Sequence, residues 1–347
     1  MELKKYFAGT FLNTLFRFNF GIKVFDSLAH PYYVQGNIEE VMEYIKKQEM
    51  QSGIHPIVNI LGESANSASE AVDYNSWYNQ IIEMTGKNNL SYLNISEKPT
   101  QLVVIDDSLK IIDSSNKQLV SALEQHVSKA ESIGLESNKT IRITLDMEDH
   151  RFTDLSLNTA KQLWSNGLPL NIVLQSCLNR TEQDITDLFS KTNYSFADEK
   201  IGVRICRGIY LEPKAIATTD KKIAKKRLLA RVEQLSNYGV YLQIATHDKE
   251  VVYEAINLLE KKNVPKKSYE IQGLMGVPNT ALLAKELIAA GHNYATYFPF
   301  EMIQGASYPY LMRRLKANPN IMWYGIKNLF QTYRDERENN KRKLLKG

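Results

Sequence analysis

The amino-acid sequence predicts an α/β fold: a (β/α)8 TIM-like barrel with an N-terminal helical extension. Three observations favour this fold. Short runs rich in β-branched and aromatic residues alternate with longer segments of helical periodicity, eight such runs follow residue 55, and no glycine-rich phosphate-binding motif is present. Strand–helix alternation indicates parallel strands with right-handed crossovers, and eight repeats favour a closed barrel over an open doubly wound sheet. The 347 residues suffice for one such barrel with an extension.

The expected strands are short, and helical segments separate them. The strands cover residues 56–61, 91–95, 141–146, 170–174, 202–206, 240–245, 268–272 and 293–298. The helical patterns cover residues 67–84, 116–132, 155–165, 220–235, 251–261 and 280–290, and one further pattern over 38–47 precedes the first strand. We therefore expect a helical extension over residues 1–54, a catalytic barrel over 55–330 and a charged tail over 331–347.

The composition is that of an ordinary globular protein. Apolar residues make up 43% and charged residues 24%, and the net charge of +4 is too small to indicate a nucleic-acid partner. The two cysteines, Cys177 and Cys206, indicate a reducing compartment and do not have the spacing of a metal site. We therefore expect a cytoplasmic protein, and its oligomeric state remains open.

The amino-terminal segment is apolar but does not match a membrane-targeting segment. Residues 6–25 are rich in Phe and Leu, yet Arg17 and Lys23 interrupt them, so they fit neither a signal peptide nor a span of about 20 apolar residues. Residues 11, 12, 15, 16, 18 and 20 instead indicate a helix with a broad apolar face. Packing of that face on the barrel or on an oligomer partner is the favoured interpretation, and peripheral contact with the inner face of the membrane is the alternative.

Polar residues gather at the ends of the expected strands, where a barrel of this type carries its chemistry. They are Glu63, Lys98, Asp146, Glu148, Gln175, Arg180, Arg204, Arg207, Thr246, His247, Asp248, Gln272, Tyr297, Arg313 and Arg314. Taken singly, a polar residue after a strand is usually the start of a solvated loop. Together, the excess of Lys and Arg predicts a barrel mouth that binds a phosphate or carboxylate. In the alternative interpretation, Asp146, Glu148 and His247 are ligands in a metal-dependent lyase or aldolase.

Nine short motifs occur in a fixed order from about residue 55 to 318. They are LGE (61–63), SEKPTQL (96–102), LDMED (145–149), QSCLNRT (175–181), VRICRGIY (203–210), ATHD (245–248), YEIQ (269–272), YFP (297–299) and YPYLMRRL (308–315). In this order they resemble the proline dehydrogenase family, both its single-domain bacterial form and the dehydrogenase part of its bifunctional enzymes. Each motif is weak alone, whereas nine in register are specific.

The resemblance implies an enzyme that binds FAD at the barrel mouth and oxidises L-proline to Δ1-pyrroline-5-carboxylate, with the electrons passing to a quinone or another acceptor. The catalytic residues that it implies are Lys98, Asp146, Tyr297, Arg313 and Arg314. The implied substrate pocket consists of Lys98, Tyr210, Leu274, Tyr297, Tyr310, Arg313 and Arg314, with the two arginines and the lysine holding the substrate carboxylate. The implied FAD contacts are Gln175, Arg204, Arg207, Thr246, His247 and Gln272, with Arg204 donating towards the flavin N5.

The sequence departs from the family pattern near the implied pocket. Arg207 stands where the family usually has Lys, Ile209 where it has a small residue, and Ala317 where it has Glu. These departures leave the reaction type intact, but they leave open a related imino acid, such as hydroxyproline, as the substrate. A barrel that binds flavin or proline without turnover is the non-enzymatic alternative.

Overall fold

The structure is a computed structural model that describes residues 32–317 apart from 63, 105–112, 191–200 and 278–279. The apolar helix expected over residues 11–20 and the charged tail expected over 331–347 lie outside the described residues, and so does Glu63. The backbone of residues 314–317 is described but their side chains are not, so the Arg314 side chain also lies outside.

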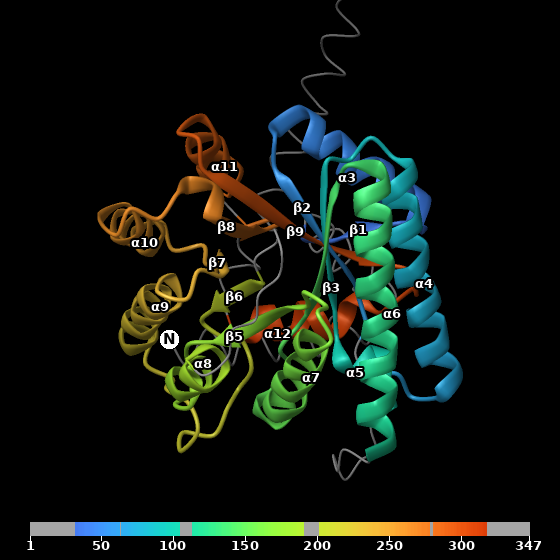
Figure 1. Ribbon diagram of the computed structural model, residues 1–347, viewed down its shortest axis with the longest axis horizontal. Helices are drawn as coiled ribbons and strands as arrows, with labels where there is room; N and C mark the ends of the chain where they lie inside the picture. The colour runs from blue at the N-terminus through green and yellow to red at the C-terminus, as the bar shows by residue number, and fades with distance from the viewer. Residues whose placement is uncertain (1–31, 63, 105–112, 191–200, 278–279, 318–347) are drawn as a thin grey trace, which may run out of the picture.

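Eight parallel strands close into a barrel (Figure 1). They are β2 (His55–Ile60), β3 (Tyr92–Glu97), β4 (Thr140–Leu145), β5 (Asn171–Gln175), β6 (Gly202–Cys206), β7 (Tyr241–Ala245), β8 (Tyr269–Leu274) and β9 (Asn293–Glu301). Each strand pairs with the next along the chain, and β9 pairs with both β8 and β2, which closes the sheet. The predicted (β/α)8 barrel is confirmed, and among the strand ends the largest difference is that β9 continues to Glu301 rather than ending at residue 298.

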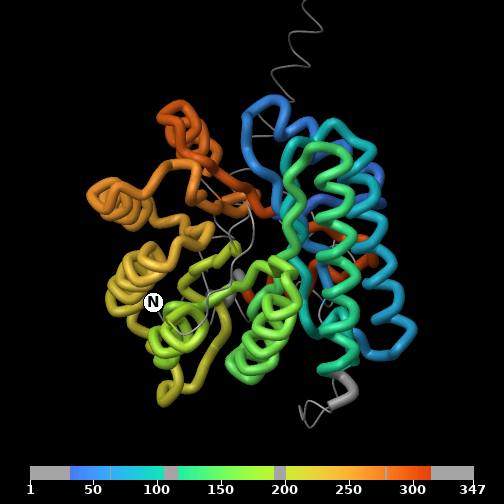
Figure 2. The backbone as a smooth tube through the Cα atoms, in the orientation of Figure 1, coloured from blue at the N-terminus to red at the C-terminus, as the bar shows by residue number. Residues whose placement is uncertain are grey.

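Helices surround the barrel (Figures 1 and 2). The outer helices are α4 (Ala68–Lys87), α6 (Asp113–Ser137), α7 (Thr153–Ser165), α8 (Thr181–Phe189), α9 (Lys221–Ser236), α10 (Lys249–Lys261) and α11 (Thr280–Ala289). The connections also hold the short helix α5 (Pro99–Leu102) and the 3-10 turns η2 (His150–Phe152) and η3 (Lys266–Ser268), and α12 (Ser307–Ala317) follows the last strand. All six helical patterns predicted between strands form helices, while α8 was not predicted.

An aspartate caps the amino-terminal end of two of these helices, α9 and α10. The Asp220 carboxylate accepts hydrogen bonds from the backbone N–H groups of Lys222 and Ile223 at the start of α9. The Asp248 carboxylate accepts one from the N–H of Val251 at the start of α10. Because each carboxylate satisfies helix N–H groups and lies at the positive end of the helix dipole, it fixes the connection that leads from the strand into the helix.

The barrel interior is polar. Apolar side chains such as Leu93 and Ile95 belong to the main hydrophobic core, which unites residues of the strands and the surrounding helices. Arg204 of β6 donates a hydrogen bond to Ser96 of β3, and because these strands are not neighbours the contact crosses the barrel interior. A barrel of this type is usually filled with branched apolar side chains. The buried charge of Arg204 therefore distinguishes this interior from the usual apolar one.

The described part of the expected extension, residues 32–54, forms a short strand and a helix. β1 (Val34–Gln35) pairs in parallel with Phe300 and Glu301 at the end of β9, a contact too short to predict from a sequence pattern. α3 (Ile38–Ser52) begins at a capping box formed by Asn37 and Glu40. The predicted helix over residues 38–47 is therefore confirmed, and it is longer than predicted.

A separate apolar cluster joins the extension to the barrel mouth. It consists of Tyr32, Tyr33, Leu61, Tyr310 and Leu311, all buried. Leu61 follows β2 at its carboxyl end, and Tyr310 and Leu311 belong to α12. Helix α12 and the residues just before β1 therefore pack together at the end of the barrel where the predicted site lies.

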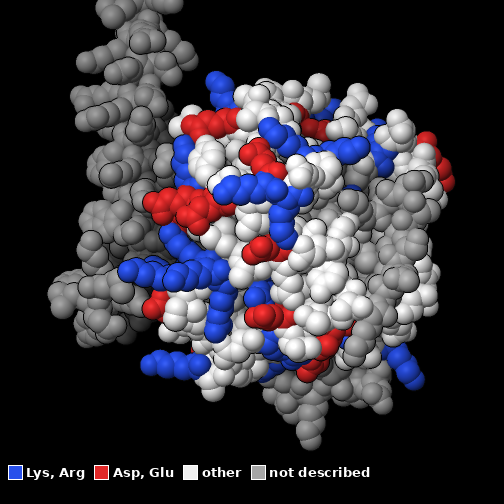
Figure 3. Space-filling view, turned by 60° about the vertical axis from the view of Figure 1, so that its left-hand side comes forward, with Lys and Arg blue, Asp and Glu red and all other residues white. Residues whose placement is uncertain are grey.

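The surface carries charges of both signs. Figure 3 shows Lys and Arg side chains interspersed with Asp and Glu on the face turned forward. Ion pairs join neighbouring elements, such as Lys225 of α9 with Asp248, and Lys249 of α10 with Glu286 of α11 at 2.9 Å. Among the described residues, no helix is long and apolar enough to cross a membrane.

Candidate active site

Arg204, on β6, is the centre of a buried network inside the barrel mouth. Its Nε donates to Gln272 Oε1 at 2.7 Å, and its Nη1 donates to Asp146 Oδ1 at 2.7 Å and to Ser96 Oγ at 3.0 Å. Arg204 is only 5% exposed, so water screens its ion pair with Asp146 weakly. Partners on or directly after three different strands hold the planar guanidinium in one orientation.

Asp146 joins Arg204 to Tyr297. It directly follows β4, and its second carboxylate oxygen, Oδ2, accepts a hydrogen bond from Tyr297 OH at 2.7 Å. The guanidinium carbon of Arg204 lies 5.4 Å from the centroid of the Tyr297 ring. Burial, and then the negative charge of Asp146, raise the pKa of Tyr297 well above its ordinary value. Tyr297 is therefore a neutral hydrogen-bond donor over the working pH range.

Lys98 lies beside this network at the end of β3. It is buried, and its Nζ donates to the carbonyl oxygen of Gly62 at 2.5 Å. Burial lowers the pKa of Lys98, while the negative charges of Glu148 and Asp146 oppose that shift. An ammonium has three N–H donors. The Gly62 carbonyl is its hydrogen-bond partner among the described residues, so the remaining donors suit an anionic ligand.

Gly62 is at a position that only glycine can occupy. Its φ is 141°, and a Cβ atom there would lie 1.9 Å from the hydroxyl of Tyr74. Its carbonyl accepts hydrogen bonds from Lys98 and, at 3.2 Å, from Gln101 Nε2. The glycine therefore allows the backbone to approach the ammonium and hold it.

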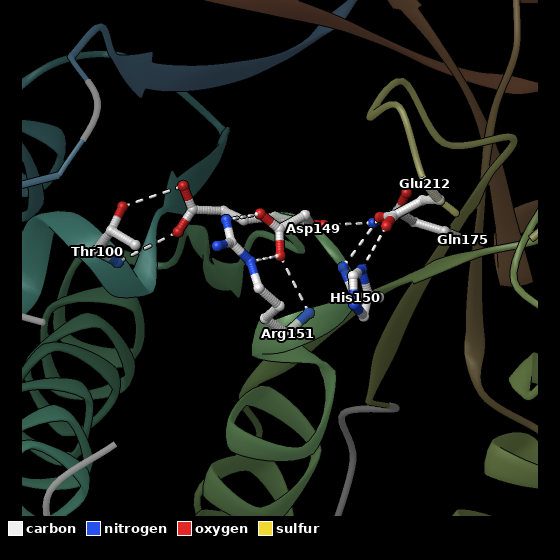
Figure 4. A network of polar contacts seen from close by, with 7 residues as sticks. Thr100, Asp149, His150, Arg151, Gln175 and Glu212 are labelled. Carbon is white, nitrogen blue, oxygen red and sulfur yellow. Dashed lines mark hydrogen bonds and ion pairs between the residues drawn. The ribbon is translucent and has the colours of Figure 1, made fainter. Parts of the chain in front are cut away.

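Glu148 and Gln175 connect the segments that follow β3, β4 and β5 (Figure 4). The Glu148 carboxylate accepts from Thr100 Oγ1 at 3.0 Å and from the Thr100 N–H at 3.3 Å. The Glu148 carbonyl accepts from Gln175 Nε2 at 2.5 Å. Burial raises the pKa of Glu148. Asp146 and Glu148 both follow β4, which ends at Leu145, so the alternation of side chains along a strand does not apply to them. Glu148 has different hydrogen-bond partners from Asp146.

Sequence reasoning missed the contact between His150 and Glu212. His150 Nδ1 lies 2.5 Å from Glu212 Oε2, and the His150 N–H donates to Glu212 Oε1 at 2.9 Å (Figure 4). The Glu212 side chain is 3% exposed, although it belongs to the loop between β6 and α9. Beside it, Arg151 contacts Asp149 at 2.5 Å. The His150–Glu212 pair joins the loops that follow β4 and β6, and no local pattern signals a contact between residues so far apart in the sequence.

Other predicted substrate-pocket residues lie on α12, at the end of β8 and in the loop after β6. The guanidinium carbon of Arg313, on α12, lies 5.7 Å from the centroid of the Tyr210 ring. Leu274, the last residue of β8, is buried, and so is Tyr310 of α12. Burial and the charges of nearby carboxylates raise the pKa of Tyr210. Arg313 and Tyr210 are therefore brought together from segments far apart in the sequence.

Three of the predicted cofactor residues lie on loops rather than in the buried network. Thr246 follows β7 and its hydroxyl accepts a hydrogen bond from the N–H of Asp248 at 3.2 Å. His247 and Arg207 are exposed. Their strand-end positions place all three at the carboxyl ends of β6 and β7. The described contacts do not connect them to Arg204.

Two buried polar atoms of the site have no hydrogen-bond partner among the described residues. They are Nη2 of Arg204, a donor, and Oε1 of Gln175, an acceptor. Leaving a buried polar atom unpaired costs about 1–3 kcal/mol. Each atom is therefore available to a polar group of a bound molecule.

The residues considered for a metal site have other partners. Both oxygens of Asp146 accept hydrogen bonds, from Arg204 and Tyr297, and the oxygens of Glu148 accept from Thr100. Across the described ranges, no three His, Cys, Asp or Glu side chains gather as ligands of one metal ion would.

Comparison with known proteins identifies the family of the chain. The family model described as proline dehydrogenase matches residues 41–322. Proline dehydrogenase 2 of Bacillus subtilis strain 168 is 26% identical over 284 residues, which cover 82% of this chain and 84% of that protein. The proline dehydrogenase of Deinococcus radiodurans is 28% identical over 295 residues, covering 78% of this chain and 89% of that protein.

Solved structures show the same fold. Proline utilization A from Bdellovibrio bacteriovorus, inactivated by N-propargylglycine, matches with a TM-score of 0.68 at 21% identity and covers 84% of this chain. Proline utilization A from Corynebacterium freiburgense matches with a TM-score of 0.68 at 19% identity and covers 88%. The chain spans about a third of the length of each, 33%. Because the family model covers most of the sequence, the chain belongs to the proline dehydrogenase family.

Proposed function

We propose that this chain oxidises L-proline to Δ1-pyrroline-5-carboxylate with FAD and passes the electrons to a quinone or another acceptor. The observation that carries the proposal is the fixed, buried Arg204 with an unpartnered Nη2 at the barrel mouth. The family match and the relatives named proline dehydrogenase support the substrate class.

The residues at the mouth fit FAD. An isoalloxazine ring carries both hydrogen-bond acceptors and a donor, which suits the unpartnered Arg204 Nη2 and Gln175 Oε1. FAD, when bound, supplies the hydride acceptor. Arg204 would donate to the ring and Gln272 would hold Arg204 in place, while Arg207, Thr246 and His247 at the strand ends would contact the rest of the dinucleotide.

Cationic side chains would hold the substrate carboxylate. Lys98 has ammonium donors beyond its bond to Gly62, and Arg313 lies against the Tyr210 ring. Together with Arg314 they would bind the anion and orient the proline ring over the flavin, and such positioning can lower a barrier by several kcal/mol. Tyr210, Leu274, Tyr297 and Tyr310 would form the walls, and Asp146 would balance the positive charge near the substrate amine.

Proline is the proposed substrate, with hydroxyproline as the competing imino acid. Ile209 is partly buried directly before Tyr210, and its branched side chain would limit the size of the ring that the proposed pocket accepts. An added ring hydroxyl would need both room and a hydrogen-bond partner. We therefore expect L-proline to react with the higher kcat/KM.

The spectrum of the purified full-length chain tests this proposal. We expect a bound flavin with a band near about 450 nm, and we expect that band to bleach when L-proline is added without oxygen. Hydroxyproline in a parallel sample ranks the two substrates. A preparation reconstituted with FAD that never bleaches would refute the oxidase function, and a chain that binds no FAD would refute the cofactor.

Arg313→Met tests the carboxylate site. Losing a charge-assisted contact costs about 1.5–3 kcal/mol, so the KM for L-proline should rise about 10- to 100-fold while flavin retention is unchanged. Arg151→Met is the matched control, because Arg151 is an arginine whose partner is Asp149. Its KM should stay within about twofold of the original value. An Arg313→Met enzyme with the original KM would remove Arg313 from the substrate site.

We also propose a cytoplasmic protein. With a quinone as acceptor, which is dissolved in the lipid, its contact with the inner face of the membrane would be peripheral. Flotation of the full-length chain with vesicles of neutral or anionic lipid tests this contact. A chain that stays at the bottom of the gradient with both vesicle types would contradict it.

A further inference from the structure

A hydrogen-bonded chain runs through the barrel interior below Arg204. Gln272 accepts from Arg204 Nε through Oε1 at 2.7 Å, and its Nε2 donates to Glu270 Oε1 at 2.7 Å. Both residues lie on β8, two positions apart, and therefore share one face of the strand. The other Glu270 oxygen, Oε2, accepts from Tyr241 OH at 3.0 Å and lies 3.1 Å from His55 Nδ1.

The lower end of this chain is at the amino-terminal rim of the barrel. His55 and Tyr241 are the first residues of β2 and β7. The His55 side chain is 25% exposed, whereas Glu270 is completely buried. The chain thus connects the rim opposite the candidate active site with the guanidinium that faces the mouth.

Glu270 is a buried anion with a full set of donors. A buried carboxylate is costly unless donors and cations surround it. Burial alone would raise its pKa, but hydrogen bonds and charge from His55, with those of Gln272 and Tyr241, lower it below the ordinary value. Arg142 also lies near, with its guanidinium carbon 4.6 Å from the centroid of the Tyr241 ring. Glu270 is therefore a permanent acceptor at neutral pH.

A permanent acceptor decides the orientation of the Gln272 amide. That amide has one donating and one accepting end, and the two are almost the same in shape. Glu270 can only accept and Arg204 Nε can only donate, so the NH2 group of Gln272 faces Glu270 and the amide oxygen faces Arg204 Nε. A glutamine at position 270 would remove the negative charge, and its own NH2 could oppose that of Gln272, which would weaken the hold of Gln272 on Arg204 Nε.

We propose that Glu270 is a positioning residue: through Gln272 it fixes the direction in which Arg204 presents Nη2 at the mouth. That the ligand of Nη2 is the flavin rests on the proposed function. Glu270 itself touches neither substrate nor cofactor, because it lies one amide side chain below Arg204.

Glu270→Gln tests the proposal, because it keeps the shape of the side chain and adds a donor. The affinity of the apoprotein for FAD, followed by flavin fluorescence, should fall about tenfold. In the reconstituted enzyme, kcat for L-proline should fall about 10- to 100-fold while KM stays within about threefold. A role limited to stability would move neither the FAD affinity nor kcat.

Glu97→Gln is the matched control. Glu97 is also completely buried on a barrel strand, and its Oε2 lies 2.9 Å from His126 Nδ1 of α6. It therefore has the same residue type, burial and histidine partner, but it faces a helix outside the barrel. We expect a similar fall in melting temperature with unchanged FAD affinity and kcat. Equal behaviour of the two variants in FAD affinity and kcat would overturn the proposal.

The double variant Glu270→Gln, Gln272→Glu tests the direction of the hydrogen bonds. In this variant the carboxylate at position 272 would accept from Arg204 Nε, and the NH2 group of the glutamine at position 270 would donate to that carboxylate. We expect FAD affinity to return to within about threefold of the original value. A double variant weaker than Glu270→Gln would contradict the proposed orientation effect.

A readout without cofactor separates this proposal from the proposed function. In the apoprotein, Glu270→Gln and Arg204→Lys should shift the melting temperature non-additively, by about 2 °C or more, whereas Glu97→Gln and Arg204→Lys should be additive. Additive shifts in the first pair would overturn the positioning role even if proline is oxidised. Non-additive shifts in a chain that binds no FAD would support the positioning role and refute only the function.

Discussion

Asp146→Asn isolates the charge that holds Arg204. The substitution keeps the size of the side chain but replaces one carboxylate oxygen with an NH2 group. Arg204 Nη1 can only donate, whereas the hydroxyl of Tyr297 can turn and accept. The amide oxygen of the variant should therefore face Arg204, and its NH2 should face Tyr297. Both contacts survive, but only the guanidinium is still charged, and the negative charge that balanced it is lost.

The loss can be estimated from the two hydrogen bonds. Each is 2.7 Å long in the original protein, and a bond to a charged group contributes about 1.5–3 kcal/mol against about 1 kcal/mol for a neutral one. The side chains of Arg204 and Asp146 are only 6% and 15% exposed, so solvent replaces little of the lost charge. Removing a partner from a buried pair altogether costs about 3–5 kcal/mol. We therefore expect Asp146→Asn to lower the free energy of unfolding by about 2–4 kcal/mol.

Urea unfolding measures this loss. Asp154→Asn is the matched control, because Asp154 pairs with Arg180 at 2.6 Å at the surface, where the two side chains are 72% and 40% exposed, and the expected loss there is within about 1 kcal/mol. A double-mutant cycle of Asp146→Asn with Tyr297→Phe should give a coupling of about 1–2 kcal/mol. If Asp146→Asn costs no more than Asp154→Asn, or if the cycle is additive, the buried network does not fix Arg204.

Two further predictions follow from backbone geometry and charge. Gly208→Ala should lower the free energy of unfolding by about 1–3 kcal/mol more than Gly239→Ala. Both glycines have positive φ, but a Cβ at 208 would lie 2.5 Å from Cys177 Sγ and 2.6 Å from Gln175 Oε1, whereas a Cβ at 239 would meet open space. Equal losses of stability in the two variants would contradict this prediction. The pKa of Glu270 lies below the ordinary 4.5, so the stability that its carboxylate contributes is complete above pH 4.5 and is lost as the pH falls through the lowered pKa. The stability difference between the original chain and Glu270→Gln, measured by urea unfolding at several pH values, should therefore narrow in acid, and a constant difference would refute the assignment.

The barrel could be predicted because local patterns repeat along the chain. Each strand is a short β-rich run between helical segments, as at 202–206, where predicted and observed bounds agree. β1 was missed because two residues carry no periodicity, and it is held by its pairing with Phe300 and Glu301. α8, from Thr181 to Phe189, was missed although it begins at the last residue of the QSCLNRT motif.

The site could be predicted only as a set of residue types at strand ends. Their contacts depend on which side chains meet across the interior, and no spacing encodes that. Arg204 and Asp146 were both named from the sequence, but their direct ion pair appears only in the structure. Glu270 and His55, 215 positions apart, gave no signal because their contact exists only after the barrel closes.

Closure of the barrel also determines when the chain can fold during synthesis. β2 leaves the ribosome before the other seven barrel strands, yet its partner on one side is β9, through pairs from His55 with Ala295 to Ile60 with Phe300. Until β9 emerges, the growing sheet has two open edges that can pair with other chains. Such long-range pairing is slow to form. A nascent chain stalled before β9 is therefore the species most exposed to aggregation and most in need of a chaperone.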